Sequence, residues 1–324
     1  RDDTVEPLQR ADFVAAAAVL AAIIDEWGVS AILLSSLIGH SLDTLRTGLP
    51  TAICTHDYYP LWPALHADFG DEQANWGDVA LAALSQCTPR GPFAEQPAAH
   101  WIALRAAYLQ AVAAADASMV APTQGVRANQ CRIAPALAQR AWQVIAHGID
   151  PMSRTDPPQP PRRDAAHPLR VLVLGNIHEG KGETLLSRVL SELNNAADAG
   201  SIEFVLLGSG DAGMRFFGQG NVHVLQTYAH ANLAREVTEL DPDLALLPAN
   251  VAETWSYTLS EIWSLGVPVL ATRLGSFAER IQHGRSGLLV DADPHAIAVL
   301  LRQLARDSTP LHALQAPALP NVAD

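Results

Sequence analysis

The chain has 324 residues, 49% of them hydrophobic, and a formal net charge of −13. This length and composition predict two globular domains, each with a core of its own, and not a disordered chain. The negative balance argues against a nucleic-acid-binding protein, and the sequence has no basic cluster suited to an anionic membrane. The longest apolar stretch, residues 13–24, is too short to cross a bilayer and is predicted to be a buried helix.

Three cysteines, Cys54, Cys87 and Cys131, are far apart in the sequence and show neither metal-site spacing nor the density of a disulfide framework. The charged start resembles no secretory signal. We therefore expect a cytoplasmic protein. Of the 21 basic residues only Lys181 is a lysine, which suggests that its position needs a compact ammonium group.

The first half of the chain predicts a less regular α/β domain, residues 1–150. Its patterns predict helices over 13–27 and 98–115 and strands over 29–34, 51–55, 118–120 and 143–145. Between them, residues 56–97 are rich in Trp, Tyr, Pro and Asp and are expected to form a long irregular loop, a kind of segment that is often functional. The prolines of residues 151–168 then predict a semi-extended linker between domains.

The second half predicts a complete Rossmann-like domain over residues 169–310, followed by a tail over 311–324. Apolar runs predict strands over 169–174, 202–207, 222–225, 244–247, 267–271 and 288–290. Helical patterns lie between or after them, over 183–193, 232–240, 259–265, 277–282 and 294–304. This alternation predicts a parallel sheet with helices on both faces.

Residues 248–280 carry the strongest functional signal. A helix is predicted to begin there near Ser256 or Tyr257, just after a strand, and the free N–H groups of a helix N-terminus suit a diphosphate. In open α/β sheets ligands bind at the carboxyl ends of the strands, which is where this segment lies. Ser256, Tyr257 and Thr258 are therefore candidate phosphate-binding residues.

Glu253 and Glu261 lie in the same segment with seven residues between them. Glu253 falls in the loop before the predicted helix and Glu261 about one turn into it, so both can face one ligand. Taken alone, the pair also fits solvated carboxylates that the helix dipole favours.

Three segments of this half together resemble the C-terminal domain of glycosyltransferase family 4. They are Glu253 to Glu261, Leu-Gly-Val-Pro-Val-Leu-Ala-Thr over 265–272 and Gly-Leu-Leu-Val over 287–290. The sequence of the first segment, Glu-Thr-Trp-Ser-Tyr-Thr-Leu-Ser-Glu, is especially similar to bacterial O-antigen and polysaccharide biosynthesis glycosyltransferases. The resemblance covers the whole second half. It implies a GT-B fold, in which two Rossmann-like domains face each other across a cleft, and a retaining reaction.

The resemblance also implies roles for the two glutamates. Glu253 would contact the donor sugar near its reacting carbon, where a carboxylate stabilises oxocarbenium-like charge. Glu261 would bind the ribose hydroxyls, because a carboxylate can accept two hydrogen bonds from a diol.

Residues 175–182, Gly-Asn-Ile-His-Glu-Gly-Lys-Gly, follow the first strand of this half and resemble the phosphate-binding loop of the family. Lys181 matches the lysine that neutralises the leaving diphosphate. Gly175 and Asn176 would approach the donor, although the family usually has a basic residue where Asn176 stands. Gly208, after the next strand, and Tyr228, after the following one, are further donor-site candidates, with a turn and core packing as the plainer interpretations.

The first half has one informative string, residues 55–63, directly after a strand. His56 matches a family histidine that contacts the donor sugar and assists catalysis. Asp57 is a candidate to orient His56 or to bind the acceptor. The aromatic side chains of Tyr58, Tyr59 and Trp62 could stack on acceptor sugars or belong to the core.

A family member usually opens with a strand and a glycine-rich loop, and this sequence starts instead with acidic residues and a helix. We therefore expect either a truncated or reduced first domain or a piece of a larger polymerising glycosyltransferase. The expected partners are a nucleotide-diphosphate sugar, as substrate, and a glycan or lipid-linked acceptor, which would place the protein at the inner membrane face. No metal or cofactor is expected. Two alternatives stay open: a GT-B-fold nucleotide-sugar epimerase and a non-catalytic nucleotide-sugar-binding or scaffolding module.

Overall fold

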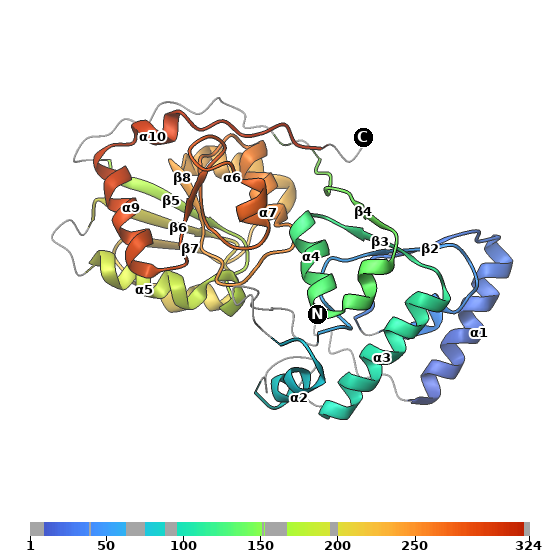
Figure 1. The fold of residues 1–324 in the computed structure, drawn as a ribbon. Coiled ribbons are helices and arrows are strands. Elements are labelled where there is room, and N and C mark those ends of the chain that lie inside the picture. The colour runs from blue at the N-terminus through green and yellow to red at the C-terminus, as the bar shows by residue number, and fades with distance from the viewer. Residues whose placement is uncertain are drawn as a thin grey trace. The chain divides into compact units, whose positions relative to one another are not determined.

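The computed structural model describes residues 10–38, 40–62, 75–87, 96–150, 152, 167–194 and 200–320. The chain forms two compact units, Arg1–Ala146 and His147–Asp324, and each is built on a parallel sheet (Figure 1).

The division between the units falls between Ala146 and His147, earlier than the linker expected over 151–168. Hydrogen bonds explain the difference. Ile149 donates its N–H to the carbonyl of Pro320 at 3.1 Å, and Met152 donates its N–H to Ser264 Oγ at 3.1 Å. These contacts place the described residues after His147 in the second unit. Most of the expected linker, residues 151 and 153–166, lies outside the described part of the chain.

The first unit has a four-stranded parallel sheet in the order β1-β2-β3-β4. The strands are β1 (Ile32–Leu34), β2 (Thr51–Cys54), β3 (Ser118–Ala121) and β4 (Trp142–Val144). Four helices accompany them in the described residues: α1 (Arg10–Trp27), α2 (Asp78–Cys87), α3 (Ala98–Ala114) and α4 (Gln124–Ile133), with short 3-10 helices η1 (Leu42–Leu45) and η2 (Pro135–Gln139). Helix α3 buries Trp101, Tyr108 and Val112, which recur at helical spacing and face one core.

Two helices of this unit were not expected. Helix α2 lies inside the stretch 56–97 that the sequence indicated as irregular, and α4 was not predicted at all. Helix α4 buries Val126, Gln130 and Ile133, so a glutamine occupies a position where an apolar residue would have revealed the period. Its start is set by Thr123, whose Oγ1 accepts the N–H of Val126 at 3.1 Å.

The second unit has a six-stranded parallel sheet in the order β10-β9-β8-β5-β6-β7. Its strands are β5 (Leu169–Leu174), β6 (Ile202–Leu207), β7 (Val222–Leu225), β8 (Leu244–Leu247), β9 (Val269–Thr272) and β10 (Leu288–Val290). Its helices are α5 (Glu183–Asn194), α6 (Leu233–Leu240), α7 (Tyr257–Ser264), α8 (Ser276–Arg280), α9 (Pro294–Arg306) and α10 (Thr309–His312), with 3-10 turns η3 (Glu179–Lys181), η4 (Asp211–Phe216) and η5 (His230–Asn232). From β5 the order runs one way to β6 and the other way to β8, which is a topological switch point.

Helices cover both faces of this sheet, as the sequence predicted (Figure 1). Alternate residues of β5 point to opposite faces. Val171 and Val173 join one core cluster with α5 and α9, and Leu172 and Leu174 join another with α6 and α7. The expected α/β class with parallel sheets is confirmed.

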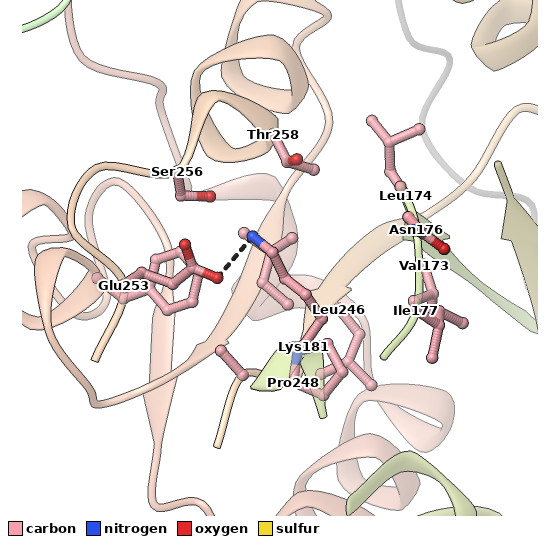
Figure 2. A pocket seen from close by; sticks show the side chains of 14 residues that line it. Val173, Leu174, Asn176, Ile177, Lys181, Leu246, Pro248, Glu253, Ser256 and Thr258 are labelled. Atoms are coloured by element: carbon pink, nitrogen blue, oxygen red, sulfur yellow. Dashed lines mark ion pairs between the residues drawn. The ribbon is translucent and has the colours of Figure 1, made fainter. Parts of the chain in front are cut away.

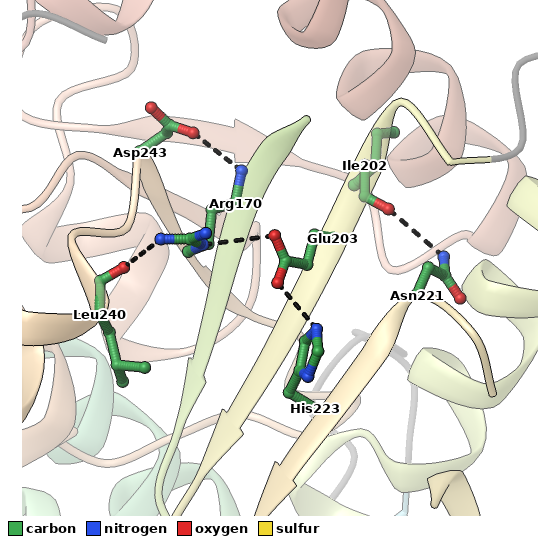
Figure 3. Close-up of polar contacts among 7 residues, drawn as sticks. All are labelled: Arg170, Ile202, Glu203, Asn221, His223, Leu240 and Asp243. Atoms are coloured by element: carbon green, nitrogen blue, oxygen red, sulfur yellow. Dashed lines mark hydrogen bonds and ion pairs between the residues drawn. The ribbon is translucent and has the colours of Figure 1, made fainter. Parts of the chain in front are cut away.

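A polar network ties together the amino-terminal ends of the strands, at the edge opposite the switch-point loops (Figure 3). Arg170 donates from Nε to Glu203 Oε2 at 3.4 Å and from Nη1 to the carbonyl of Leu240 at 2.7 Å. Glu203 Oε1 lies 2.8 Å from His223 Nε2. Arg170, Glu203 and His223 are the second residues of β5, β6 and β7, so the network links three neighbouring strands close to where they begin.

Candidate functional site

A pocket opens at the switch point, where the loops after β5 and β8 meet (Figure 2). Its volume is about 50 Å³. The expected donor-binding residues Gly175, Asn176, Ser256 and Thr258 line it, together with Lys181 and Glu253. Residues from two distant stretches of sequence therefore share one cavity, because β5 and β8 are neighbours in the sheet.

Lys181 and Glu253, two of the predicted catalytic residues, form an ion pair inside this pocket (Figure 2). Lys181 Nζ lies 2.6 Å from Glu253 Oε1, and the side chain of Glu253 is 14% exposed. Lys181 ends the turn η3, and Gly182 follows with a φ of 83°. A Cβ on Gly182 would lie 1.7 Å from the carbonyl oxygen of Pro248, so this close approach of the two loops requires glycine.

The loop over Glu253–Ser256 leads into α7 with an unusual backbone. Ser256 has φ 67° and ψ 90°, and its Oγ accepts the N–H of Leu259 at 3.3 Å. Within the described part of the chain, the N–H groups of Tyr257 and Thr258, which come before Leu259, form no hydrogen bond and are available to a ligand. The conformation is strained for a non-glycine residue, and such strain persists only where surrounding contacts enforce it.

Glu261 and Tyr228 come together beside the pocket. Glu261 Oε1 lies 2.9 Å from His230 Nε2, and burial, helped by the negative charge of Glu261, raises the pKa of Tyr228. Tyr228 packs on Gly208 so closely that a Cβ there would lie 2.4 Å from the ring. His230 was not identified from the sequence. The sequence signal that indicates His230 is its position soon after β7, at the carboxyl ends of the strands.

Tyr257 and Thr258 begin α7 but face different neighbours. Thr258 Oγ1 would lie 3.7 Å from a Cβ on Gly175, so the first turn of α7 approaches the loop after β5. Tyr257 does not line the pocket; its ring stacks on His147 with centroids 5.5 Å apart. Four of the candidate donor residues thus do not line the cavity: Tyr257, Glu261, Gly208 and Tyr228.

His56 lies at the carboxyl end of β2 in the first unit, as predicted. Its Nε2 lies 3.0 Å from Ser35 Oγ, which follows β1. Asp57 accepts the N–H of Tyr59 at 2.9 Å, and burial raises the pKa of its carboxyl group. Asp57 and Tyr59 line a small cavity with Ser35, which makes this strand edge polar and accessible.

Tyr58 and Trp62 belong to the core of the first unit and not to an open surface. Tyr58 is 2% exposed and Trp62 is 7% exposed. Asn129 donates to the Tyr58 hydroxyl at 3.2 Å, and Trp62 packs edge-on against Trp76 with centroids 4.9 Å apart. The suggestion that these two rings stack on acceptor sugars is therefore wrong, and the core alternative holds.

Within the described ranges, no three His, Cys, Asp or Glu side chains gather closely enough to hold a metal ion. None of the helices in those ranges combines the length and hydropathy needed to cross a bilayer.

Comparisons with known proteins agree with this fold. Residues 168–307 match the family model of glycosyl transferases group 1. The chain is 25% identical over 158 residues to a D-inositol 3-phosphate glycosyltransferase of Pseudarthrobacter chlorophenolicus, a match that covers 45% of this chain and 32% of that protein. The chain thus spans about a third of the length of this curated relative.

Solved structures resemble the chain over nearly its whole length. HepE of Anabaena, in complex with UDP and glucose, has a TM-score of 0.59 at 14% identity, covering 95% of this chain and 77% of that one. Sucrose-phosphate synthase of Thermosynechococcus elongatus has a TM-score of 0.62 at 14% identity, covering 97% and 74%. These are GT-B glycosyltransferase folds. Residues 168–307 are thus similar in sequence to the glycosyl transferases group 1 family, and the chain is similar in fold to these solved structures.

Proposed function

We propose that this protein is a retaining, metal-independent glycosyltransferase of the family 4 type. It would move a hexose or deoxyhexose from a nucleoside-diphosphate sugar to a glycan or lipid-linked acceptor in cell-surface polysaccharide synthesis. The observation that carries the proposal is the Lys181–Glu253 pair at 2.6 Å in the switch-point pocket. The complexes of HepE and of the pneumococcal O-GlcNAc transferase GtfA with UDP are further support.

The charges of the pocket suit the departure of a nucleoside diphosphate. The leaving group gains negative charge as the glycosidic bond breaks, and a fixed ammonium such as Lys181 stabilises that charge. The free N–H groups at the start of α7 add donors without a metal ion. In this proposal the carboxylate of Glu253, which pairs with Lys181, stabilises positive charge on the sugar.

The remaining residues have supporting roles in this proposal. Glu261 binds the ribose diol, with Tyr228 and Gly208 beside it. Gly175 and Asn176 let the loop after β5 approach the diphosphate. For the first unit, we propose that His56 contacts the donor sugar and assists catalysis, and that Asp57 orients His56 or binds the acceptor.

The test begins with calorimetric titration of UDP, GDP, dTDP and CDP into the parent protein and the variant Lys181→Met. Binding of one nucleotide class by the parent, weakened in the variant, supports the donor site. The sugar nucleotide of that class is then incubated with and without glycan acceptors, and the anomeric configuration of the product is read by NMR. Transfer with retention supports the proposal. Conversion of the donor without any acceptor would indicate an epimerase, and binding without turnover would indicate a scaffolding module.

A further inference from the structure

Arg280, the last residue of α8, has its guanidinium under the loop that carries Glu253 and Ser256. Nη1 donates to the carbonyl oxygens of Trp255 at 2.6 Å and of Ser256 at 3.0 Å, and Nη2 donates to Ser260 Oγ at 2.6 Å. The guanidinium carbon lies 3.6 Å from the centroid of the Trp255 ring. A single side chain thus contacts the loop, its aromatic residue and the first turns of α7.

The backbone that Arg280 contacts is the strained part of the site. Ser256 has a φ of 67°, a conformation that is unfavourable for a serine. The amino-terminal end of α8 fastens the same loop, because Ser276 donates its N–H to the carbonyl of Glu253 at 2.8 Å and its Oγ to that of Trp255 at 3.0 Å. A Cβ on Gly275 would lie 2.5 Å from the Glu253 carbonyl oxygen. Residues of α8 therefore bind the carbonyl groups of Glu253, Trp255 and Ser256 and hold the loop against this helix.

The charge of Arg280 is also unusual. Among the described residues, no carboxylate forms an ion pair with it, and its hydrogen bonds go to two carbonyls and a hydroxyl. Burial lowers its pKa to about 10, which still leaves the side chain charged near neutral pH. A partly buried positive charge therefore lies next to the start of α7.

This charge acts on the peptide groups that begin the helix. The carbonyls of Trp255 and Ser256 belong to the peptide groups whose N–H donors are those of Ser256 and Tyr257. A cation bonded to a carbonyl strengthens the donor at the other end of the same peptide group. The effect adds to the partial positive charge of the helix N-terminus.

We propose that Arg280 is a positioning residue: it holds the Glu253–Ser256 loop in its strained conformation and strengthens the first-turn donors of α7 toward an anionic diphosphate. Its action on a diphosphate rests on the proposed function. Its hold on the loop rests only on the contacts above. Arg280 ends the segment 248–280 that carries the strongest functional signal, but no sequence pattern indicated this role.

The experiment compares the parent with Arg280→Met, Arg280→Lys and, as a matched control, Arg285→Met, which removes an exposed arginine from the turn after α8. Hydrogen exchange of peptides covering residues 253–259 is measured together with the dissociation constants of UDP and UMP. Melting temperatures establish that each variant is folded at the assay temperature.

Arg280→Met is expected to speed exchange in this segment and to weaken UDP about tenfold, the size of one lost charge-assisted hydrogen bond, with a smaller loss for UMP. Arg280→Lys keeps the positive charge but lacks the planar guanidinium group with its several donors. We expect this variant to show smaller changes in exchange and in UDP affinity than Arg280→Met. The control is expected to change neither.

Unchanged exchange over 253–259 in Arg280→Met would overturn the loop-holding role. Equal losses for UDP and UMP would overturn the action on the diphosphate, because a general structural defect weakens both. If the parent binds none of the four nucleoside diphosphates, the proposed function fails, and the exchange measurement still decides whether Arg280 holds the loop.

Discussion

His230 Nε2 lies 2.9 Å from Glu261 Oε1, so an imidazole contacts one oxygen of the carboxylate that we propose as the ribose ligand. The side chain of His230 is 67% exposed and that of Glu261 is 14% exposed. The histidine can therefore turn away toward solvent at little cost, while the glutamate stays in place on α7. This difference makes the two residues separable by mutation.

Glu261→Gln is expected to weaken nucleoside diphosphate binding about tenfold, because a neutral amide accepts hydrogen bonds from a diol less strongly than a carboxylate does. His230→Gln removes the imidazole from the same carboxylate and is the matched control, with an expected change of less than about threefold. Calorimetry at one pH and salt concentration measures both. Equal effects of the two substitutions would contradict the assignment of Glu261 as the ribose ligand.

Lys181→Met is expected to lower kcat for sugar transfer by about 10²–10³, the usual effect of removing one group that stabilises developing negative charge. Lys181→Arg keeps a cation and should retain more activity than Lys181→Met, although a planar guanidinium group differs in shape from a compact ammonium group. Initial rates at saturating donor measure the effect, and thermal unfolding serves as the check on folding. A normal kcat with a raised KM in Lys181→Met would instead mean that the lysine only binds the donor.

Gly182→Ala and Gly284→Ala separate steric clash from backbone strain. Both glycines have positive φ, 83° and 77°, but a Cβ on Gly182 would meet the carbonyl of Pro248, whereas one on Gly284 would meet nothing within 4 Å. We expect Gly284→Ala to cost about 1 kcal/mol of stability and Gly182→Ala about 3 kcal/mol or more. Urea unfolding measures both values, and similar losses would show that the loops after β5 and β8 are not held as closely as described.

Asp57→Asn is expected to stabilise the protein at neutral pH. Burial raises the pKa of the Asp57 carboxyl in the folded state, so the charged form weakens folding as pH rises through that value. The neutral amide can still accept the N–H of Tyr59. The advantage over the parent should shrink as the pH falls below the raised pKa and vanish below the ordinary aspartate range.

Urea unfolding at several pH values checks the Asp57 prediction. Asp25→Asn, on the exposed side of α1, is the control and should show no such trend. A gain from Asp57→Asn that grows at acid pH would reverse the sign and refute the burial argument.

Arg170→Met is expected to lower the free energy of unfolding by about 1–2 kcal/mol, since it removes hydrogen bonds to Glu203 and to the carbonyl of Leu240. Because the network lies at the amino-terminal ends of the strands (Figure 3), nucleotide affinity should not change. A combined loss of stability and affinity would mean that the two edges of the sheet are coupled.

The sequence by itself determined most of the second unit. Its strands over 169–174, 202–207, 222–225, 244–247 and 288–290 have the predicted bounds. Parallel strands buried on both faces are continuous apolar runs, here often ended by glycine or proline. Since ligands bind at the carboxyl ends of such strands, Lys181 and Glu253 could be placed at one edge before the sheet order was known.

Only the tertiary structure decided how those residues meet. The pairing of Lys181 with Glu253 depends on β5 lying next to β8, and strand order is a long-range property with no local pattern. The contacts of Arg280 with the loop before α7 are long-range in the same way. The structure also separated Tyr58 from Tyr59, which are adjacent in sequence: one ring is in the core and the other lines a cavity. Adjacent aromatic residues in a loop have no period that would show which one is buried, because burial there depends on the helices that pack against it.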